Sequence, residues 1–166
     1  MQDFATTDLC DANEERVELG VIRVLAPGML AFGRRRRFFG KVTTLSVFED
    51  NTLVRATVEK PGEGRVLFVD GGGSSRVALF GGNLAALAAQ NAWQGIVING
   101  AVRDADELDA CDIGVRALSV VPLRSKKLGG GSAQVTLNLQ GVEVRPDDWC
   151  YADRDGIIVS SVPLLP

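Results

Sequence analysis

The chain has 166 residues, of which 46% are hydrophobic, and this fits one globular domain, residues 1–166, with a substantial core. A formal net charge of −3 and a pI of about 5.0 argue against a surface that is basic overall, so we expect direct binding neither to nucleic acid nor to anionic membranes. The absence of histidine excludes Ser–His–Asp and Cys–His triads, histidine-based zinc sites and imidazole acid–base catalysis.

The cysteines and the N-terminus bear on the cellular compartment and on disulfide or zinc sites. Cys10, Cys111 and Cys150 are odd in number and widely spaced, which suggests neither a disulfide framework nor a zinc knuckle. No apolar run reaches transmembrane length, and the acidic N-terminus lacks the order of a signal peptide, so we expect a cytoplasmic protein. An enzyme of this composition would work with carboxylates, Arg or Lys, backbone amides, water and a hard metal.

The first sixty residues are predicted to contain two short helices and two strands. Thr7 or Asp8 is expected to cap the first helix, and Asn51 or Asp50 the second. The elements are a helix at 7–12, a strand at 21–25, a turn at 26–29, a strand at 41–48 and an amphipathic helix at 51–60.

Four successive arginines, Arg34 to Arg37, lie in the loop before the second of these strands. Such a run could attract phosphate groups of RNA or an acidic partner protein. More often it is a solvated loop, and no aromatic spacing supports RNA binding here. We therefore favour the solvated loop.

The middle of the chain is predicted to hold two strands, at 65–69 and 76–80, and a helix at 84–92. Between the strands, Asp70-Gly-Gly-Gly-Ser74 matches neither the dinucleotide fingerprint nor the lysine-bearing nucleotide loop, so a tight turn is favoured. The glycines before the helix leave free amides at its positive end, where an anion could dock. The alternative is ordinary capping by Asn83.

A strand at 95–99, which ends at Gly100, leads to Arg103 and Asp104 at the edge where open α/β sheets place their ligands. Arg offers a rigid fork of donors for a carboxylate, and Asp offers hard oxygen for a cation such as Mg²⁺. Taken alone, the dipeptide is more simply explained by pairing of the two residues with each other or with solvent at the start of the next helix. The elements after it are an acidic helix at 106–111, a strand at 115–121, an exposed and mobile loop at 123–132, hairpin strands at 135–139 and 142–144, a turn at 153–156 and a strand at 157–160.

Five strings spread over the chain together resemble the family of the regulator of ribonuclease activity A (RraA). They are Phe48-Glu-Asp-Asn51, Val69-Asp-Gly-Gly-Gly-Ser74, Gly95-Ile-Val-Ile-Asn-Gly-Ala-Val-Arg-Asp104, Asp112-Ile-Gly-Val-Arg-Ala-Leu118 and Tyr151-Ala-Asp-Arg-Asp-Gly-Ile157. That family includes metal-dependent 4-hydroxy-4-methyl-2-oxoglutarate aldolases, whose signature is Gly, twenty residues, Arg-Asp, two residues, then Glu or Asp. Gly82, Arg103-Asp104 and Glu107 satisfy this spacing, and the match reverses the ion-pair interpretation.

The resemblance implies an α/β fold, a single-domain swivelling β/β/α sandwich, which assembles as a trimer or a dimer of trimers with clefts between subunits. By the same resemblance, Asp104 holds Mg²⁺ or Mn²⁺, partly through water, and Arg103 contacts the pyruvoyl part of a 2-keto acid substrate. The substrate carboxylate is expected on the backbone amides of Gly81, Gly82, Asn83 and Leu84.

The activity implied is retro-aldol cleavage of 4-hydroxy-4-methyl-2-oxoglutarate to pyruvate, together with oxaloacetate decarboxylation. Glu107, one helical turn from Asp104, is expected to orient a metal-bound water for the acid–base work. An alternative is a non-enzymatic regulator that binds and inhibits ribonuclease E, which the short chain and Arg34 to Arg37 would suit. A third activity associated with the family, an S-adenosylmethionine:demethylmenaquinone methyltransferase, has little physical support.

Overall fold

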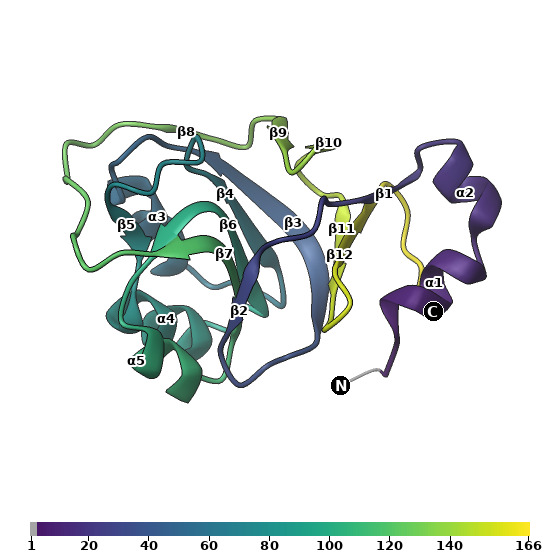
Figure 1. Cartoon of the computed structure of the whole chain (residues 1–166), viewed down its shortest axis with the longest axis horizontal. Coiled ribbons are helices and arrows are strands. Elements are labelled where there is room, and N and C mark those ends of the chain that lie inside the picture. The colour runs from purple at the N-terminus through teal and green to yellow at the C-terminus, as the bar shows by residue number, and fades with distance from the viewer. Residues whose placement is uncertain (1–2) are drawn as a thin grey trace.

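Four parallel strands form the centre of the protein in a computed structural model that describes residues 3–166 (Figure 1). They lie in the order β3, β4, β6, β7, and β5 pairs with the last residues of β6, beyond the end of β4. Parallel neighbours need a crossover, and α3, α4 and α5 supply it. The bounds are β3 Phe38–Ser46, α3 Thr52–Val58, β4 Val66–Asp70, β5 Ala78–Phe80, α4 Gly82–Gln90, β6 Gly95–Val102, α5 Ala105–Ala110 and β7 Gly114–Val120.

Antiparallel strands extend both edges of this centre. On one side β11 pairs with the first half of β3, and β12 and β1 follow outward, whereas β2 pairs with β7 on the other side. A separate hairpin, β9 with β10, lies over the sheet, and the short β8 pairs with β3. The bounds are β1 Ile22–Val24, β2 Leu30–Phe32, β8 Ser132–Ala133, β9 Leu137–Leu139, β10 Val142–Val144, β11 Trp149–Ala152 and β12 Ile157–Ser160.

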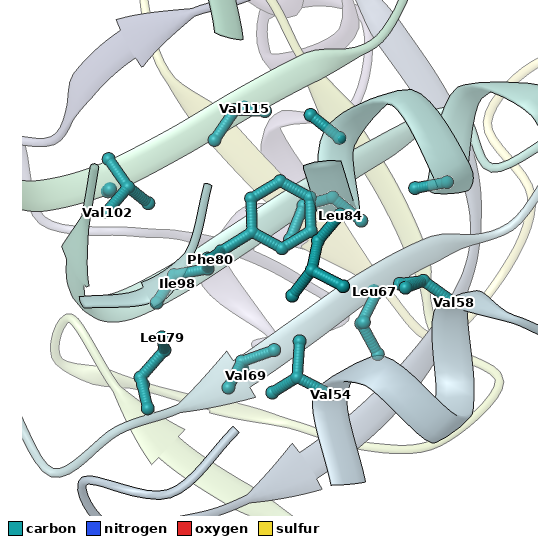
Figure 2. Close-up of a cluster of buried hydrophobic side chains, with 14 of the residues drawn as sticks. Val54, Val58, Leu67, Val69, Leu79, Phe80, Leu84, Ile98, Val102 and Val115 are labelled. Atoms are coloured by element: carbon teal, nitrogen blue, oxygen red, sulfur yellow. The ribbon is translucent and has the colours of Figure 1, made fainter. Parts of the chain in front are cut away.

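Alternate residues of the central strands face two different hydrophobic layers. In β4, Leu67 and Val69 pack with α3, α4 and α5, whereas Val66 and Phe68 pack with the antiparallel strands and the β9–β10 hairpin. Figure 2 shows the helix-side cluster, with Phe80 next to Leu84 of α4 at its centre. Burial on both faces explains why these strands read as continuous apolar runs in the sequence. The layering of helices, sheet and sheet confirms the predicted single-domain α/β sandwich.

Two short helices, α1 (Thr6–Asp11) and α2 (Glu14–Glu18), cover the outer face of β11 and β12, far from α3 to α5 (Figure 1). The prediction that Thr7 or Asp8 caps α1 is wrong, because Ala5 precedes the helix and no side chain of the helix caps it. Instead the amide and the hydroxyl of Thr6 both donate to the carboxylate of Asp153, each at 2.7 Å. The cap comes from the opposite end of the chain.

The other elements agree with the sequence except where tertiary pairing intervenes. Asp50 accepts from the amide of Thr52 at 2.9 Å, which confirms one of its two predicted caps. The predicted end of β6 at Gly100 is wrong, because β5 and β7 offer partners for Ala101 and Val102 after an irregularity in register. The sequence patterns did not predict α2, β2, β8 and β11, which are short or lack an alternation of apolar and polar residues. None of the helices in residues 3–166 is long and apolar enough to cross a membrane.

Candidate active site at the ends of β5 and β6

The Arg103–Asp104 pair occupies the turn between β6 and α5. The amide of Arg103 donates to the carbonyl of Phe80 at 3.0 Å, which fastens the turn to the end of β5. Asp104 has a left-handed backbone, φ 58° and ψ 50°, a conformation that Asp tolerates better than most residues. Its carbonyl accepts from the amide of Leu108 at 2.9 Å and so begins α5. The backbone therefore fixes where the Asp104 carboxylate stands.

The amino end of α4 meets this carboxylate directly. The amide of Gly82 donates to Oδ2 of Asp104 at 3.1 Å, and Nε of Arg103 lies 3.8 Å from the same oxygen. The predicted helix start is corrected, because α4 begins at Gly82 and Asn83 lies inside its first turn rather than capping it. Parts of the chain separated by twenty residues are thus brought together at the carboxyl edge of the sheet.

The same contact changes the expected role of one amide. Gly82 was expected to offer its N–H to a substrate carboxylate, but this N–H is already donated to Asp104. The amides of Asn83 and Leu84 lie in the first turn of α4, where an α-helix has no internal acceptor for them. These two amides, together with that of Gly81 just before the helix, are the ones that an incoming anion can use.

Two glycines are required because carboxylates lie against their main chain. A Cβ on Gly81 would stand 2.6 Å from Oδ2 of Asp104. A Cβ on Gly82 would stand 2.0 Å from Oε2 and 2.7 Å from Cβ of Glu107. Such separations are far inside van der Waals contact, and the Cβ of Glu107 cannot swing away as the tip of a flexible side chain could. The geometry gives a physical reason for the glycine that precedes the Arg-Asp and Glu positions.

The donor set at this point fits a hard divalent cation. The Asp104 side chain is 36% exposed, and its Oδ1 accepts no hydrogen bond from residues 3–166. Mg²⁺ is commonly held by one or two carboxylates and completed by water and substrate oxygens. Within the described part of the chain, no three Cys, Asp or Glu side chains are grouped as a ready-made cage. Asp104 would thus hold the cation as its single protein ligand, with water and substrate supplying the rest.

A small hollow of about 100 Å³ adjoins the pair. Its walls include residues that the sequence did not identify as site residues, and two of them, Asn51 and Ser125, carry buried side-chain oxygens without a partner in residues 3–166. The others are Ala78, Phe80 and the cations Arg55, Arg124 and Lys127. One signal was available, because Arg124 to Lys127 follows the apolar strand β7 and the carboxyl ends of parallel strands share one edge.

A buried carboxylate holds part of this wall in place. Oδ1 of Asp50 accepts from the amide of Thr52 at 2.9 Å, and Oδ2 accepts from the amide of Leu128 at 2.5 Å. Burial by itself would raise the pKa of Asp50, but these hydrogen bonds outweigh it and lower the pKa. The ionised carboxylate thus ties the loop after β7 to the start of α3. The loop is exposed as predicted, apart from the buried Ser125.

Two larger hollows lie elsewhere, and neither is lined by Arg103 or Asp104. One of about 660 Å³ adjoins Trp149, and one of about 720 Å³ adjoins the buried Arg116. The guanidinium of Arg116 donates to the carbonyls of Val115, Arg36 and Asp153. These bonds hold the turn before β3 and the turn after β11 against β7, which is a structural role.

The arginine run is largely neutralised by carboxylates. The pairs are Arg35 with Asp112, Arg36 with Asp109, and Arg37 with Asp3. Arg35 is held best, because it donates through Nε and Nη2 to the two oxygens of Asp112 at 3.0 and 2.9 Å and through Nη1 to Gln94. The segment is a loop at the surface, as favoured from the sequence, and three of its four arginine side chains also have acidic partners there.

The glycine cluster after β4 is a tight turn whose amides are used internally. Gly71 and Gly73 both donate to the carbonyl of Asn99, at 3.0 and 3.1 Å, and Gly72 donates to the carboxylate of Asp70 at 2.9 Å. A loop that cradles a nucleotide must offer its amides to the ligand. The amides of Gly71, Gly72 and Gly73 are therefore not available to a nucleotide.

Comparisons with known proteins agree with this placement of the site. A model of the RraA-like family, described as Aldolase/RraA, matches residues 6–159. A protein of Paraburkholderia phymatum named "Putative 4-hydroxy-4-methyl-2-oxoglutarate aldolase" is 56% identical over 163 residues, which cover 98% of this chain and 99% of that protein. Chain length therefore does not set this protein apart from a relative that bears the aldolase name.

Two solved structures are similar over almost the whole chain. The "RNA-processing inhibitor RraA" of Thermus thermophilis shares 47% identity at a TM-score of 0.91 and covers 98% of this chain and 95% of its own. A structure from Geobacillus kaustophilus described as "S-adenosylmethionine: 2-dimethylmenaquinone methyltransferase" shares 41% identity at a TM-score of 0.89, with 97% of each chain covered. The relatives thus bear three different functional names on one fold.

Proposed function

Because the chain belongs to the RraA-like family, we propose that it is a divalent-metal-dependent 4-hydroxy-4-methyl-2-oxoglutarate aldolase, a lyase that releases pyruvate. One observation carries the proposal. The amide of Gly82 contacts the carboxylate of Asp104, next to Arg103, so the separated parts of the aldolase signature form one site. The name of the Paraburkholderia phymatum relative supports the same activity.

The reaction breaks the bond between C3 and C4 of the substrate. The C4 hydroxyl loses its proton and becomes the carbonyl of one pyruvate, and the electron pair of the broken bond moves toward C3 and the C2 carbonyl. Protonation of C3 gives the second pyruvate. Negative charge develops at the C2 oxygen in the transition state, so fixed positive charge there lowers the barrier.

The residues of this chain supply that positive charge and the orientation. The amides of Gly81, Asn83 and Leu84, at the positive end of α4, would bind the C1 carboxylate. Arg103, half-exposed beside the carboxylate of Asp104, would donate to the C2 oxygen. A divalent cation on Asp104 would supply a Lewis acid for the same oxygen. No lysine is needed to form a Schiff base.

Proton transfer is assigned to a water molecule that Glu107 orients. Glu107 lies in the first turn of α5, and its carboxylate packs on the main chain of Gly82. From there it would orient a water molecule next to the C4 hydroxyl of the bound substrate. Glu107 is therefore a positioning residue for the water that accepts the proton.

The proposal is tested by measuring pyruvate release by the purified protein with and without Mg²⁺ or Mn²⁺. We expect metal-dependent release from 4-hydroxy-4-methyl-2-oxoglutarate, and also from oxaloacetate, because decarboxylation develops charge at the same C2 oxygen. Asp104→Ala should abolish both, whereas Asp106→Ala, an exposed carboxylate two residues away, should leave both intact. Release without metal, or a normal rate in Asp104→Ala, would exclude the mechanism.

Assembly as a trimer or a dimer of trimers is part of the proposal. Apolar side chains are exposed near the site, among them Leu123, 61% exposed, and Leu128, 80% exposed. Covering such side chains with another subunit would remove apolar surface from water. Analytical ultracentrifugation should therefore show a trimer or a hexamer, and a monomer at micromolar concentration would contradict it.

A second candidate is a non-enzymatic role as an inhibitor of ribonuclease E. It is favoured by the 47% identity with the Thermus thermophilis protein described as an RNA-processing inhibitor. Binding in a pull-down with ribonuclease E, together with slower RNA cleavage, would support it. The methyltransferase activity has less support, because the amides of the glycine turn after β4 are already donated within the chain. Calorimetry with S-adenosylmethionine should show no binding.

A further inference from the structure

The hollow beside Arg103 and Asp104 carries more positive charge than binding the C1 carboxylate of the substrate requires. Four cationic side chains, those of Arg55, Arg103, Arg124 and Lys127, line it together with the single carboxylate of Asp104. Arg55 pairs with Glu59 outside the hollow, so three positive charges remain against one negative, an excess of two. In the proposed function, the C1 carboxylate is bound by the amides of α4 and the C2 oxygen by Arg103. The remaining cations have no assigned partner in the substrate.

Of these cations, Arg124 is held in the most definite position. The amide of Ala78 donates to the carbonyl of Leu123 at 2.7 Å, and the amide of Ser125 donates back to the carbonyl of Ala78 at 3.2 Å. These two bonds fix the backbone of Arg124 in register with β5, the strand that leads directly into Gly81 and α4. The side chain is therefore presented to the hollow from a defined backbone rather than from a free loop.

Arg124 is also free of a competing anion. Within residues 3–166 its guanidinium forms no hydrogen bond and no ion pair. Arg55, by contrast, donates to Glu59 one helical turn away at 2.9 Å. Lys127 offers a point charge on a flexible stem, whereas a guanidinium offers a planar fork that matches a carboxylate. Arg124 is thus the residue best suited to bind a second carboxylate.

We infer that Arg124 binds the distal carboxylate of the substrate and makes the site selective for dicarboxylic 2-oxo acids over monocarboxylic ones. This inference rests on the proposed function and adds a specificity residue that lies outside the Gly–Arg-Asp–Glu signature. Lys127 and Arg55 add favourable charge around the same group. An uncharged group in that position would leave the excess positive charge uncompensated.

The test compares two ligands that differ only at the far end. 2-Oxoglutarate and 2-oxopentanoate share the 2-oxo acid group and the chain length, and the first ends in a carboxylate where the second ends in a methyl group. Neither has a 4-hydroxyl group, so neither can undergo the retro-aldol reaction, and calorimetry with Mg²⁺ measures binding alone. The wild-type protein should bind 2-oxoglutarate about tenfold more tightly or better.

Two variants and a control isolate Arg124. Arg124→Met should reduce the preference to near one without changing the affinity for 2-oxopentanoate, and Arg124→Lys should restore part of it. Arg16→Met, on the exposed α2 far from the site, should keep the wild-type preference.

The outcomes separate this inference from the proposed function. Equal binding of both acids by the wild type, or an unchanged preference in Arg124→Met, would overturn the role of Arg124 and leave metal-dependent pyruvate release untouched. If neither acid binds in the presence of Mg²⁺, the 2-oxo acid site itself is wrong and the role of Arg124 is overturned with it.

Discussion

Asp153 ties the N-terminal helices to the turn between β11 and β12, and replacing its carboxylate should destabilise the fold. Its oxygens accept from the amide and the hydroxyl of Thr6, both at 2.7 Å, and from the amide of Asp155 at 2.9 Å. In Asp153→Asn one oxygen becomes an NH₂ group, so at least one of these buried donors loses its acceptor. A buried donor left without an acceptor costs about 1–3 kcal/mol.

The expected loss in the free energy of unfolding is therefore about 1–3 kcal/mol at pH 7. For a chain of this size, each kcal/mol lowers Tm by about 2–4 °C, so a fall of roughly 2–12 °C should accompany it. Urea denaturation followed by circular dichroism measures the first quantity, and a thermal scan measures the second. Asp155→Asn is the matched control, because this neighbouring carboxylate is exposed.

The pH dependence gives an independent check on the same residue. Burial alone would raise the pKa of Asp153, but hydrogen bonds from Thr6, Asp155 and Gly156 outweigh it and lower the pKa in the folded state. A carboxyl group with a lowered folded pKa stabilises the protein above its unfolded pKa of about 3.9, and the contribution is lost as the pH falls toward the folded pKa. The wild type should lose stability below about pH 4, and Asp153→Asn should lose less. A variant within about 0.5 kcal/mol of the wild type at pH 7 would refute the reasoning.

Three further predictions follow from the site and the core. Gly82→Ala should lower pyruvate release about a hundredfold, as expected for a displacement of about 1 Å, because its Cβ would lie 2.0 Å from Oε2 of Glu107. Gly156→Ala, where a Cβ meets nothing within 4 Å, should not lower pyruvate release. Equal rates for the two variants would show that the Glu107 side chain moves aside without disturbing the site. Leu108→Ala should cost about 2–5 kcal/mol in urea denaturation, because Leu108 is fully buried, whereas Leu19→Ala, at a site 71% exposed, should cost under about 0.5 kcal/mol. Labelled single-stranded RNA should show no binding tighter than roughly 10⁻⁴ M by fluorescence anisotropy at physiological salt, since three of Arg34 to Arg37 have carboxylate partners, and micromolar binding weakened by Arg36→Ala would contradict this.

The site shows where local pattern stops being informative. The sequence identified Arg103, Asp104 and Glu107 because their spacing from Gly82 resembles the aldolase signature of the RraA family. It did not identify Arg124, which lies twenty residues after Asp104 and reaches the hollow through the pairing of its backbone with Ala78. It also did not reveal that the amide of Gly82 is taken by Asp104.

The central strands and their helices were determined by the sequence itself, because burial on both faces demands continuous apolar runs that can be recognised within a few residues. Tertiary structure alone decided which distant groups meet. Asp153 caps α1 across 147 residues, and β6 runs past Gly100 because β5 and β7 supply partners for its last residues. A buried polar group must find a partner wherever the folded chain places one, and that placement depends on the path of the whole backbone rather than on neighbouring residues.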